Sequence, residues 1–205
     1  MTQTSQSQVR KRLASVLAAA VTGFALLATS VPAFAAWDLQ QLMDTLAQNK
    51  SGRATFVETK RIAMLDKPVE SSGELLFTAP DRLEKRTLKP KPESMVVNGD
   101  EMLVERGTRK YQVQLQAYPQ LAAFIDSIRG TLAGDRKALE RSYRLSLDGS
   151  AESWSLQLLP LDEKMQAVVK RIRIAGSRDQ VKSVEIVQAD GDSSLMVIEK
   201  STATQ

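Results

Sequence analysis

Residues 95–115 have the sequence MVVNGDEMLVERGTRKYQVQL, and this stretch decides the fold class. Asn98-Gly99 is the strongest hairpin signal in the chain, because both central residues of a type I′ turn need a positive φ angle. In the last run, Lys110 to Leu115, apolar and polar side chains alternate, which leaves one dry face on the strand. The stretch therefore predicts three short antiparallel strands joined by tight turns.

The same pattern of short runs and turn residues extends in both directions from this stretch, from Arg53 to the end of the chain. The predicted strands are residues 56–64, 73–78, 83–88, 95–97, 102–105, 110–115, 143–147, 154–158, 168–174, 181–188 and 194–199. So many sequential hairpins with few helices predict a mainly β (α+β) fold, in which about eleven strands form a strongly curved antiparallel sheet.

Two amphipathic helices accompany the predicted strands. Asp38 can cap a helix that runs to about Gln48 and carries one apolar stripe. A second helix, Pro119 to about Ala133, interrupts the strand series, and a short helix follows over residues 135–141. The apolar stripe of the helix over residues 119–133 consists of Leu121, Phe124, Ile125, Ile128 and Leu132. We expect the helices to cover the concave side of the sheet, over either a packed core or a pocket. An aliphatic lining without polar or charged groups would restrict any ligand to apolar molecules.

The composition excludes several classes of chemistry. The chain has no histidine and no cysteine, which rules out Ser-His-Asp triads, cysteine nucleophiles, zinc fingers and His-ligated metals. The net charge of +4 comes from 28 basic and 24 acidic residues. Three of the basic residues lie in residues 1–35, which hold no acid, so residues 36–205 have 25 basic and 24 acidic residues. This balance argues against a nucleic-acid partner, which needs several uncompensated cations.

The N-terminal residues predict export. A basic cluster, Arg10 to Arg12, precedes the uncharged run Leu13 to Ala28 and then Ala33-Phe34-Ala35, which is the order of a secretory signal. We expect residues 1–35 to be a signal peptide cleaved between Ala35 and Ala36, and residues 36–205 to be one domain in the periplasm. The alternative is an uncleaved anchor, since residues 13–37 carry no charge and a bilayer span needs about 20 residues.

Candidate catalytic and metal-binding groups are few. Asp190-Gly191-Asp192 lacks the further oxygen ligands of a calcium loop, and a hairpin with solvated carboxylates is the favoured interpretation. The pairs Asp162-Glu163 and Asp100-Glu101 lie in or beside predicted turns, where carboxylates are usually helix caps or solvated. The Ser-x-x-Lys signature does not occur after residue 35. We expect no enzyme, metal or cofactor.

The densest basic cluster of the predicted domain lies between residues 82 and 91. It comprises Arg82, Lys85, Arg86, Lys89 and Lys91. On a strand these residues do not share one face. Our interpretation is a charged sheet edge that discourages aggregation, and contact with anionic lipid head groups or a membrane partner is the alternative.

Several segments together resemble the LolA-like periplasmic lipoprotein carriers. Residues 72–80, SGELLFTAP, are similar to the family's S-G-x-L-x-F-x-x-P strand. The N-terminal helix and residues 56–60, 92–104, 158–160 and 172–198 fit the family in the same order. No single motif is specific, but their order and spacing are. The sequence is more similar to the divergent LolA-like proteins than to the housekeeping carrier.

The resemblance implies an unclosed antiparallel barrel with a helical lid, whose apolar concave lining shelters acyl chains. It implies a lipoprotein, glycolipid or related amphiphile as cargo, an inner-membrane exporter or release complex as donor, and an outer-membrane acceptor. The family's carrier has a lid-latching arginine immediately before the strand-end proline, and here that residue is Ala79. The latch is therefore absent, replaced by a neighbour such as Arg82, or irrelevant to a different cargo.

Strand parity assigns candidate lining residues within that barrel. The lipid-binding candidates are Leu75, Phe77, Phe56, Met95, Val97, Tyr111, Val113, Leu145, Leu147, Trp154 and Leu156 from the strands, with Phe124, Ile125 and Ile128 from the lid. Our primary hypothesis is a monomeric periplasmic carrier that passes an amphiphile between membranes. The alternative is a lipid-sensing periplasmic regulator of a membrane signalling partner, and an enzyme comes third.

Overall fold

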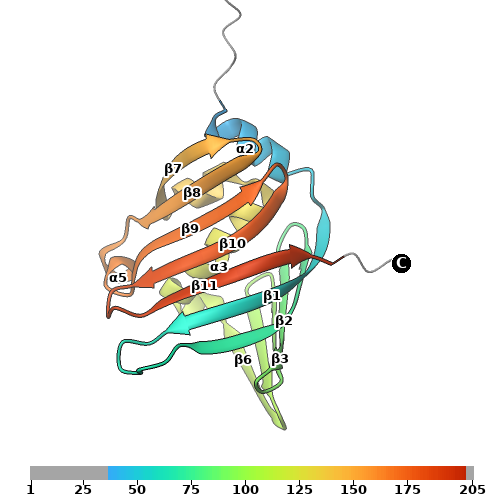
Figure 1. Ribbon diagram of the computed structural model, residues 1–205, viewed down its shortest axis with the longest axis vertical. Helices are drawn as coiled ribbons and strands as arrows, with labels where there is room; N and C mark the ends of the chain where they lie inside the picture. The colour runs from blue at the N-terminus through green and yellow to red at the C-terminus, as the bar shows by residue number, and fades with distance from the viewer. Residues whose placement is uncertain (1–36, 202–205) are drawn as a thin grey trace, which may run out of the picture. The chain divides into compact units, whose positions relative to one another are not determined.

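A computed structural model describes residues 37–201, which form an antiparallel sheet with helices on its concave side (Figure 1). The strand order is β6-β5-β4-β3-β2-β1-β11-β10-β9-β8-β7. The strands are β1 (Ser51–Arg61), β2 (Val69–Thr78), β3 (Arg82–Lys89), β4 (Glu93–Asn98), β5 (Glu101–Arg106), β6 (Arg109–Gln114), β7 (Tyr143–Ser150), β8 (Ser153–Pro160), β9 (Val169–Ser177), β10 (Gln180–Gln188) and β11 (Ser193–Lys200). The predicted mainly β fold with eleven strands is confirmed.

Two features of the topology create the lid. The first and last strands pair with each other, as in Phe56 opposite Ile198, so β1 and β11 join the two halves of the sheet. The outer strands β6 and β7 are not neighbours in the strand order of the described residues, and the sheet stays open. The chain that connects them is helical. It contains the 3₁₀ turn η1 (Leu115–Ala117), α3 (Pro119–Ala133) and α4 (Arg136–Glu140).

The remaining helices are α2 (Leu39–Leu46) and the single turn α5 (Glu163–Gln166). In α2, Asp38 accepts a hydrogen bond from the Gln41 N–H at 2.8 Å and the Gln41 side chain accepts one from the Asp38 N–H. This capping box satisfies two amide groups at the helix start. The sequence did not predict α5 or η1, because each is too short to show a helical period.

Gly134 sets the close approach of α2 and α3. It ends α3 in the left-handed conformation, at φ 67°. A Cβ at this position would lie 2.1 Å from the Met43 carbonyl oxygen, so the two helices could not meet with a larger residue here. The predicted helix stop is therefore also a packing contact between the helices.

The hairpin at Asn98 differs from the expected turn by one residue. Asn98 pairs with Glu101, so Gly99 and Asp100 are the central residues. Gly99 has a φ of 56°, and Asp100 is not among the described residues with positive φ. A positive φ at the first central position alone is the requirement of a type II′ turn and not of the predicted type I′ turn.

Two separate hydrophobic cores hold α3 over the sheet. The larger core joins α2, α3 and α4 to strands β7–β10, with Leu42, Met43 and Trp154 buried in it. The smaller core joins the start of α3 to β4–β6 through Val97 and Ile125. Phe124 packs against both cores. Both cores contact residues 121–128 of α3, and neither core contains a residue of the central strands β1, β2 and β11.

The expected signal peptide, residues 1–35, lies outside the described residues. Residues 36–205 form one compact unit. Within the described residues no helix is long and apolar enough to cross a membrane.

We predict that Gly73→Ala destabilises the fold by about 1–3 kcal/mol or more, as overpacking does. A Cβ on Gly73 would lie 1.9 Å from the Arg86 carbonyl oxygen, where β2 and β3 pair irregularly. Gly52→Ala on β1 is the matched control, because a Cβ there has no atom within 4 Å. Denaturant unfolding measures both, and equal stability of the two variants would contradict the packing seen at Gly73.

Candidate functional site

A cavity of about 600 Å³ lies between the concave face of the sheet and α3. Strands from both halves of the sheet contribute to its wall. The apolar lining residues are Ala54, Ile62, Leu75, Leu76, Phe77, Leu83, Met95, Phe124, Ile125, Ile128, Leu132, Ile174, Val181, Val184, Ile186, Met196 and Ile198. A cavity of this size is within the usual range of 300–1,000 Å³ for small-molecule sites, and its wall is mainly aliphatic.

The structure brings some of the predicted lining residues together in this cavity. They are Leu75, Phe77 and Met95 from β2 and β4, and Phe124, Ile125 and Ile128 from α3. Leu75 and Phe77 lie on one face of β2, two residues apart, as strand parity requires. The lid helix and the strand with the family motif therefore face each other across the same space.

The other predicted residues lie outside this cavity lining. Leu145, Leu147, Trp154 and Leu156 belong to the larger core, and Val97 and Val113 to the smaller one. Phe56 is buried, with its ring 4.9 Å from the Lys85 ammonium nitrogen. Tyr111 is 48% exposed on β6. Parity predicted the concave face for these residues, but it could not show where helices fill the concavity.

Sequence reasoning did not name the C-terminal part of the wall. Strands β9–β11 supply Ile174, Val184, Ile186, Met196 and Ile198 to the cavity. The apolar run Leu195 to Ile198 on β11 was visible in the sequence. What was missing is the pairing of β1 with β11, which places these strands beside the cavity.

The expectation of a lining without polar or charged groups is wrong. Glu58 on β1 and Lys85 on β3 both line the cavity, and the Lys85 ammonium donates a hydrogen bond to Glu58 Oε2 at 2.6 Å. Glu58 is only 5% exposed. Its other oxygen lies 3.6 Å from the Lys60 ammonium, and the Ser71 hydroxyl lies 3.4 Å from Oε2. The wall is therefore mixed. Besides its apolar residues, it includes the charged residues Arg53, Glu58, Lys60, Arg61, Glu84, Lys85, Glu93, Asp179, Asp192 and Lys200.

The interpretation of the basic cluster as a sheet edge is also wrong. It lies mainly on β3, which pairs with β2 on one side and β4 on the other. Lys85 faces the cavity, whereas Arg82 and Arg86 form ion pairs with Glu84. The cluster is thus divided between the two faces of an interior strand.

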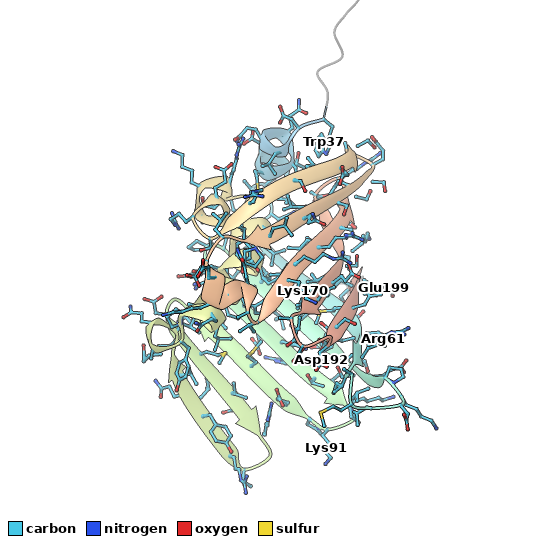
Figure 2. The ribbon with its side chains drawn as sticks, turned by 90° about the vertical axis from the view of Figure 1, so that its left-hand side faces the viewer. Trp37, Arg61, Lys91, Lys170, Asp192 and Glu199 are labelled. Carbon is cyan, nitrogen blue, oxygen red and sulfur yellow. The ribbon has the colours of Figure 1, made fainter. Side chains whose placement is uncertain are left out.

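Charged residues line the cavity at the junction of β1 and β11. Arg61 ends β1 opposite Ser193, and Arg61 and Asp192 both line the cavity (Figure 2). Asp192 Oδ1 accepts a hydrogen bond from the Ala63 N–H at 2.8 Å, which ties the β10–β11 turn to the loop after β1.

The lid is anchored by polar groups on α3 and β7 and not by Arg82. Arg129 on α3 donates a hydrogen bond to the Gly99 carbonyl oxygen at 2.6 Å and pairs with Asp126. At the other side of the lid, the Tyr143 hydroxyl donates to the Ala123 carbonyl oxygen at 3.1 Å. Both contacts use backbone carbonyls as acceptors, and Ala79 has no side-chain donor for such a role.

Tyr143 keeps its proton over the whole physiological range. Burial raises the pKa of its phenol to about 12, because an apolar environment disfavours the phenolate. The nearby Asp126 carboxylate also raises this pKa, and a hydrogen bond with Ser127 lowers it. The hydroxyl therefore remains a donor to the lid.

The candidate carboxylates have structural partners. Asp162 caps α5 by accepting from the Met165 N–H, and Asp190 accepts from the Asp192 N–H within its turn. Asp100 accepts from the Gln116 side chain, and Glu101 from Gln114. Among residues 37–201, no group of three or more acidic side chains is placed to hold a metal ion.

We predict that Arg129→Gln loosens the lid. The Arg129 side chain is 13% exposed, and loss of a hydrogen bond from a charged group costs about 1.5–3 kcal/mol. Amide hydrogen exchange in α3 should become about tenfold faster or more. Arg136→Gln, which breaks an exposed pair with Glu140, is the control and should leave this exchange unchanged. Unaltered protection of α3 in Arg129→Gln would show that the contact does not hold the lid.

Solved structures with similar folds come from several bacteria. A LolA superfamily protein from Nitrosomonas europaea is 9% identical, over 82% of this chain and 96% of that chain, with a TM-score of 0.45. The MucA/MucB complex of Pseudomonas aeruginosa is 14% identical, with a TM-score of 0.46, over 80% of this chain but only 56% of that chain. LprF from Mycobacterium bovis is 11% identical, over 82% and 94%, with a TM-score of 0.34.

No curated protein sequence matched the chain. A family model does match. It is described as "Outer membrane lipoprotein carrier protein LolA-like", and it covers residues 31–204. This description names a carrier protein and no class of enzyme. Because the match spans nearly all of the sequence after the expected signal peptide, the chain belongs to the LolA-like family of outer membrane lipoprotein carrier proteins.

Proposed function

We propose that the protein is a periplasmic carrier that shields the acyl chains of a lipoprotein, glycolipid or related amphiphile between the inner and outer membranes. The observation that carries this proposal is the cavity beneath α3, with its aliphatic wall. Both cores contact α3, which lines this space, so the space is a feature of the fold and not a packing defect.

The energetics of lipid transfer favour such a cavity. Burial of one methylene contributes about 0.8 kcal/mol, so a chain with about twelve methylenes gains on the order of 10 kcal/mol when it leaves water. That gain is large enough to retain an acyl chain during transit. The same apolar burial stabilises an acyl chain in a membrane. The cargo can therefore be released to an acceptor that buries more of its apolar surface.

The proposed transfer needs no reaction on this chain. The cargo would be received from an inner-membrane exporter or release complex and passed to an outer-membrane acceptor. The difference in apolar burial between donor, carrier and acceptor would set the direction. The lid contacts at Gly99 and Ala123 are few enough to break and re-form when cargo enters or leaves.

We predict that Leu75→Arg reduces acyl-chain binding by about tenfold or more, because it places an unpaired charge on the cavity wall. Leu195→Arg is the matched control. Leu195 is 45% exposed, and its neighbour Met196 lines the cavity from the opposite face of β11. Fluorescence titration with a long-chain fatty acid analogue measures both variants after circular dichroism has shown that they fold.

If folded Leu75→Arg binds the fatty acid analogue with wild-type affinity, the cavity wall at Leu75 is not part of the binding site. A loss of equal size in Leu195→Arg would show that the effect is a general one of added charge. Absence of acyl-chain binding by the wild-type protein would contradict the carrier proposal itself.

A further inference from the structure

The ion pair between Glu58 and Lys85 has no evident structural necessity. Glu58 lies almost fully within the protein, and moving a carboxylate and an ammonium out of water costs several kcal/mol per ion. A buried ion pair is often no more stabilising than apolar residues of similar volume. The aliphatic residues around it would complete the wall equally well.

Lys85 has hydrogen-bonding capacity left over. An ammonium group has three N–H donors, and Glu58 is the sole hydrogen-bond acceptor of Lys85 within residues 37–201. The Lys85 side chain is 22% exposed, although the residue lies on an interior strand. Its remaining donors can therefore be reached from the cavity.

The charges around Glu58 do not balance. Lys85 and Lys60 both lie beside this one carboxylate, at 2.6 Å and 3.6 Å. Two ammonium groups therefore share one carboxylate, and the Lys85 side chain is only 22% exposed. Such a site attracts an anion much more strongly than an exposed lysine does, because the interaction is less screened.

An acyl-chain surface adjoins this positive charge. Lys85 pairs across the sheet with Leu75 on one side and Met95 on the other, and both residues line the cavity. Along β1 the charged cavity residues Glu58, Lys60 and Arg61 follow one another toward the end of the strand, and Arg53 lines the cavity at the other end beside Ala54. The cavity is amphipathic, as an amphiphilic ligand would require.

We propose that Lys85, positioned by Glu58 and assisted by Lys60, binds an anionic phosphate or carboxylate headgroup of an amphiphile whose acyl chain lies over Leu75 and Met95. This inference rests on the proposed lipid-carrier function and narrows it to anionic cargo. Glu58 acts as a positioning residue, which holds the ammonium against the wall and leaves its other donors directed to the ligand.

The test compares two ligands that differ only in the phosphate, a monoacylglycerol and the corresponding monoacylglycerol phosphate, below their micelle concentrations. Each displaces an uncharged fluorescent probe from the protein. We expect the wild type to bind the phosphate form about tenfold more tightly, as a charge-assisted hydrogen bond provides. The double variant Glu58→Gln/Lys85→Met removes both charges and keeps the side-chain lengths. It should lose this preference and bind the neutral lipid within about twofold of wild type.

Two further variants guard against a folding defect in the double variant. Lys60→Met changes a half-exposed side chain and should lose part of the preference. Lys170→Met is the control, because Lys170 is exposed on β9 and is not a cavity-lining residue (Figure 2). In the wild type the preference should decrease as salt is added, whereas binding of the neutral lipid should not.

The outcomes separate the two proposals. Equal wild-type affinity for both lipids, or a preference that survives in the double variant, would overturn the headgroup site and leave the carrier function standing. Failure of both lipids to bind the wild type would overturn both. Displacement of the phosphate lipid by inorganic phosphate alone would indicate a site for free phosphate and contradict a lipid headgroup as its ligand.

Discussion

The open edge between β6 and β7 is the constraint on which the other features depend. Because β1 pairs with β11, the two ends of the folded domain meet in the middle of the sheet, and its two outer strands are left to be joined by the chain between them. That chain must cross the concave side, and it does so as α3. Residues 121–128 of α3 pack into two separate cores, and the same helix lines the cavity. The lid is thus a direct result of strand order.

Much of this architecture was predictable from the sequence, because alternation and turn residues report locally on strands. The capped N-terminal helix, the inserted helix and its stop at Gly134 were predictable for the same reason. The turn after Asn98 was not, since Asn-Gly and Gly-Asp both suit a two-residue loop and the choice depends on strand register. One residue of difference there changed the turn type without changing the faces of the strands.

The binding site was only partly predictable. Parity identified the concave face, but Trp154 and Leu156 on that face are covered by the apolar stripe of α2 and became core. The choice between core and cavity depends on helix placement, which no local pattern encodes. The Glu58–Lys85 pair was not predicted for a related reason. The two residues lie 27 positions apart and meet only through the register of β1, β2 and β3. A single charge in a strand usually indicates a solvated side chain, and here it lines a cavity.

The most direct measurement is native mass spectrometry, with lipid extraction, of the protein purified without detergent from the periplasm of its own host. A cavity of about 600 Å³ with an aliphatic wall should retain its cargo through such a purification. If the protein carries lipid, one amphiphile with at least one acyl chain should be bound per chain. Protein that is reproducibly empty, while folded and with its lid protected from hydrogen exchange, would contradict lipid carriage and indicate an interaction module with an unfilled core.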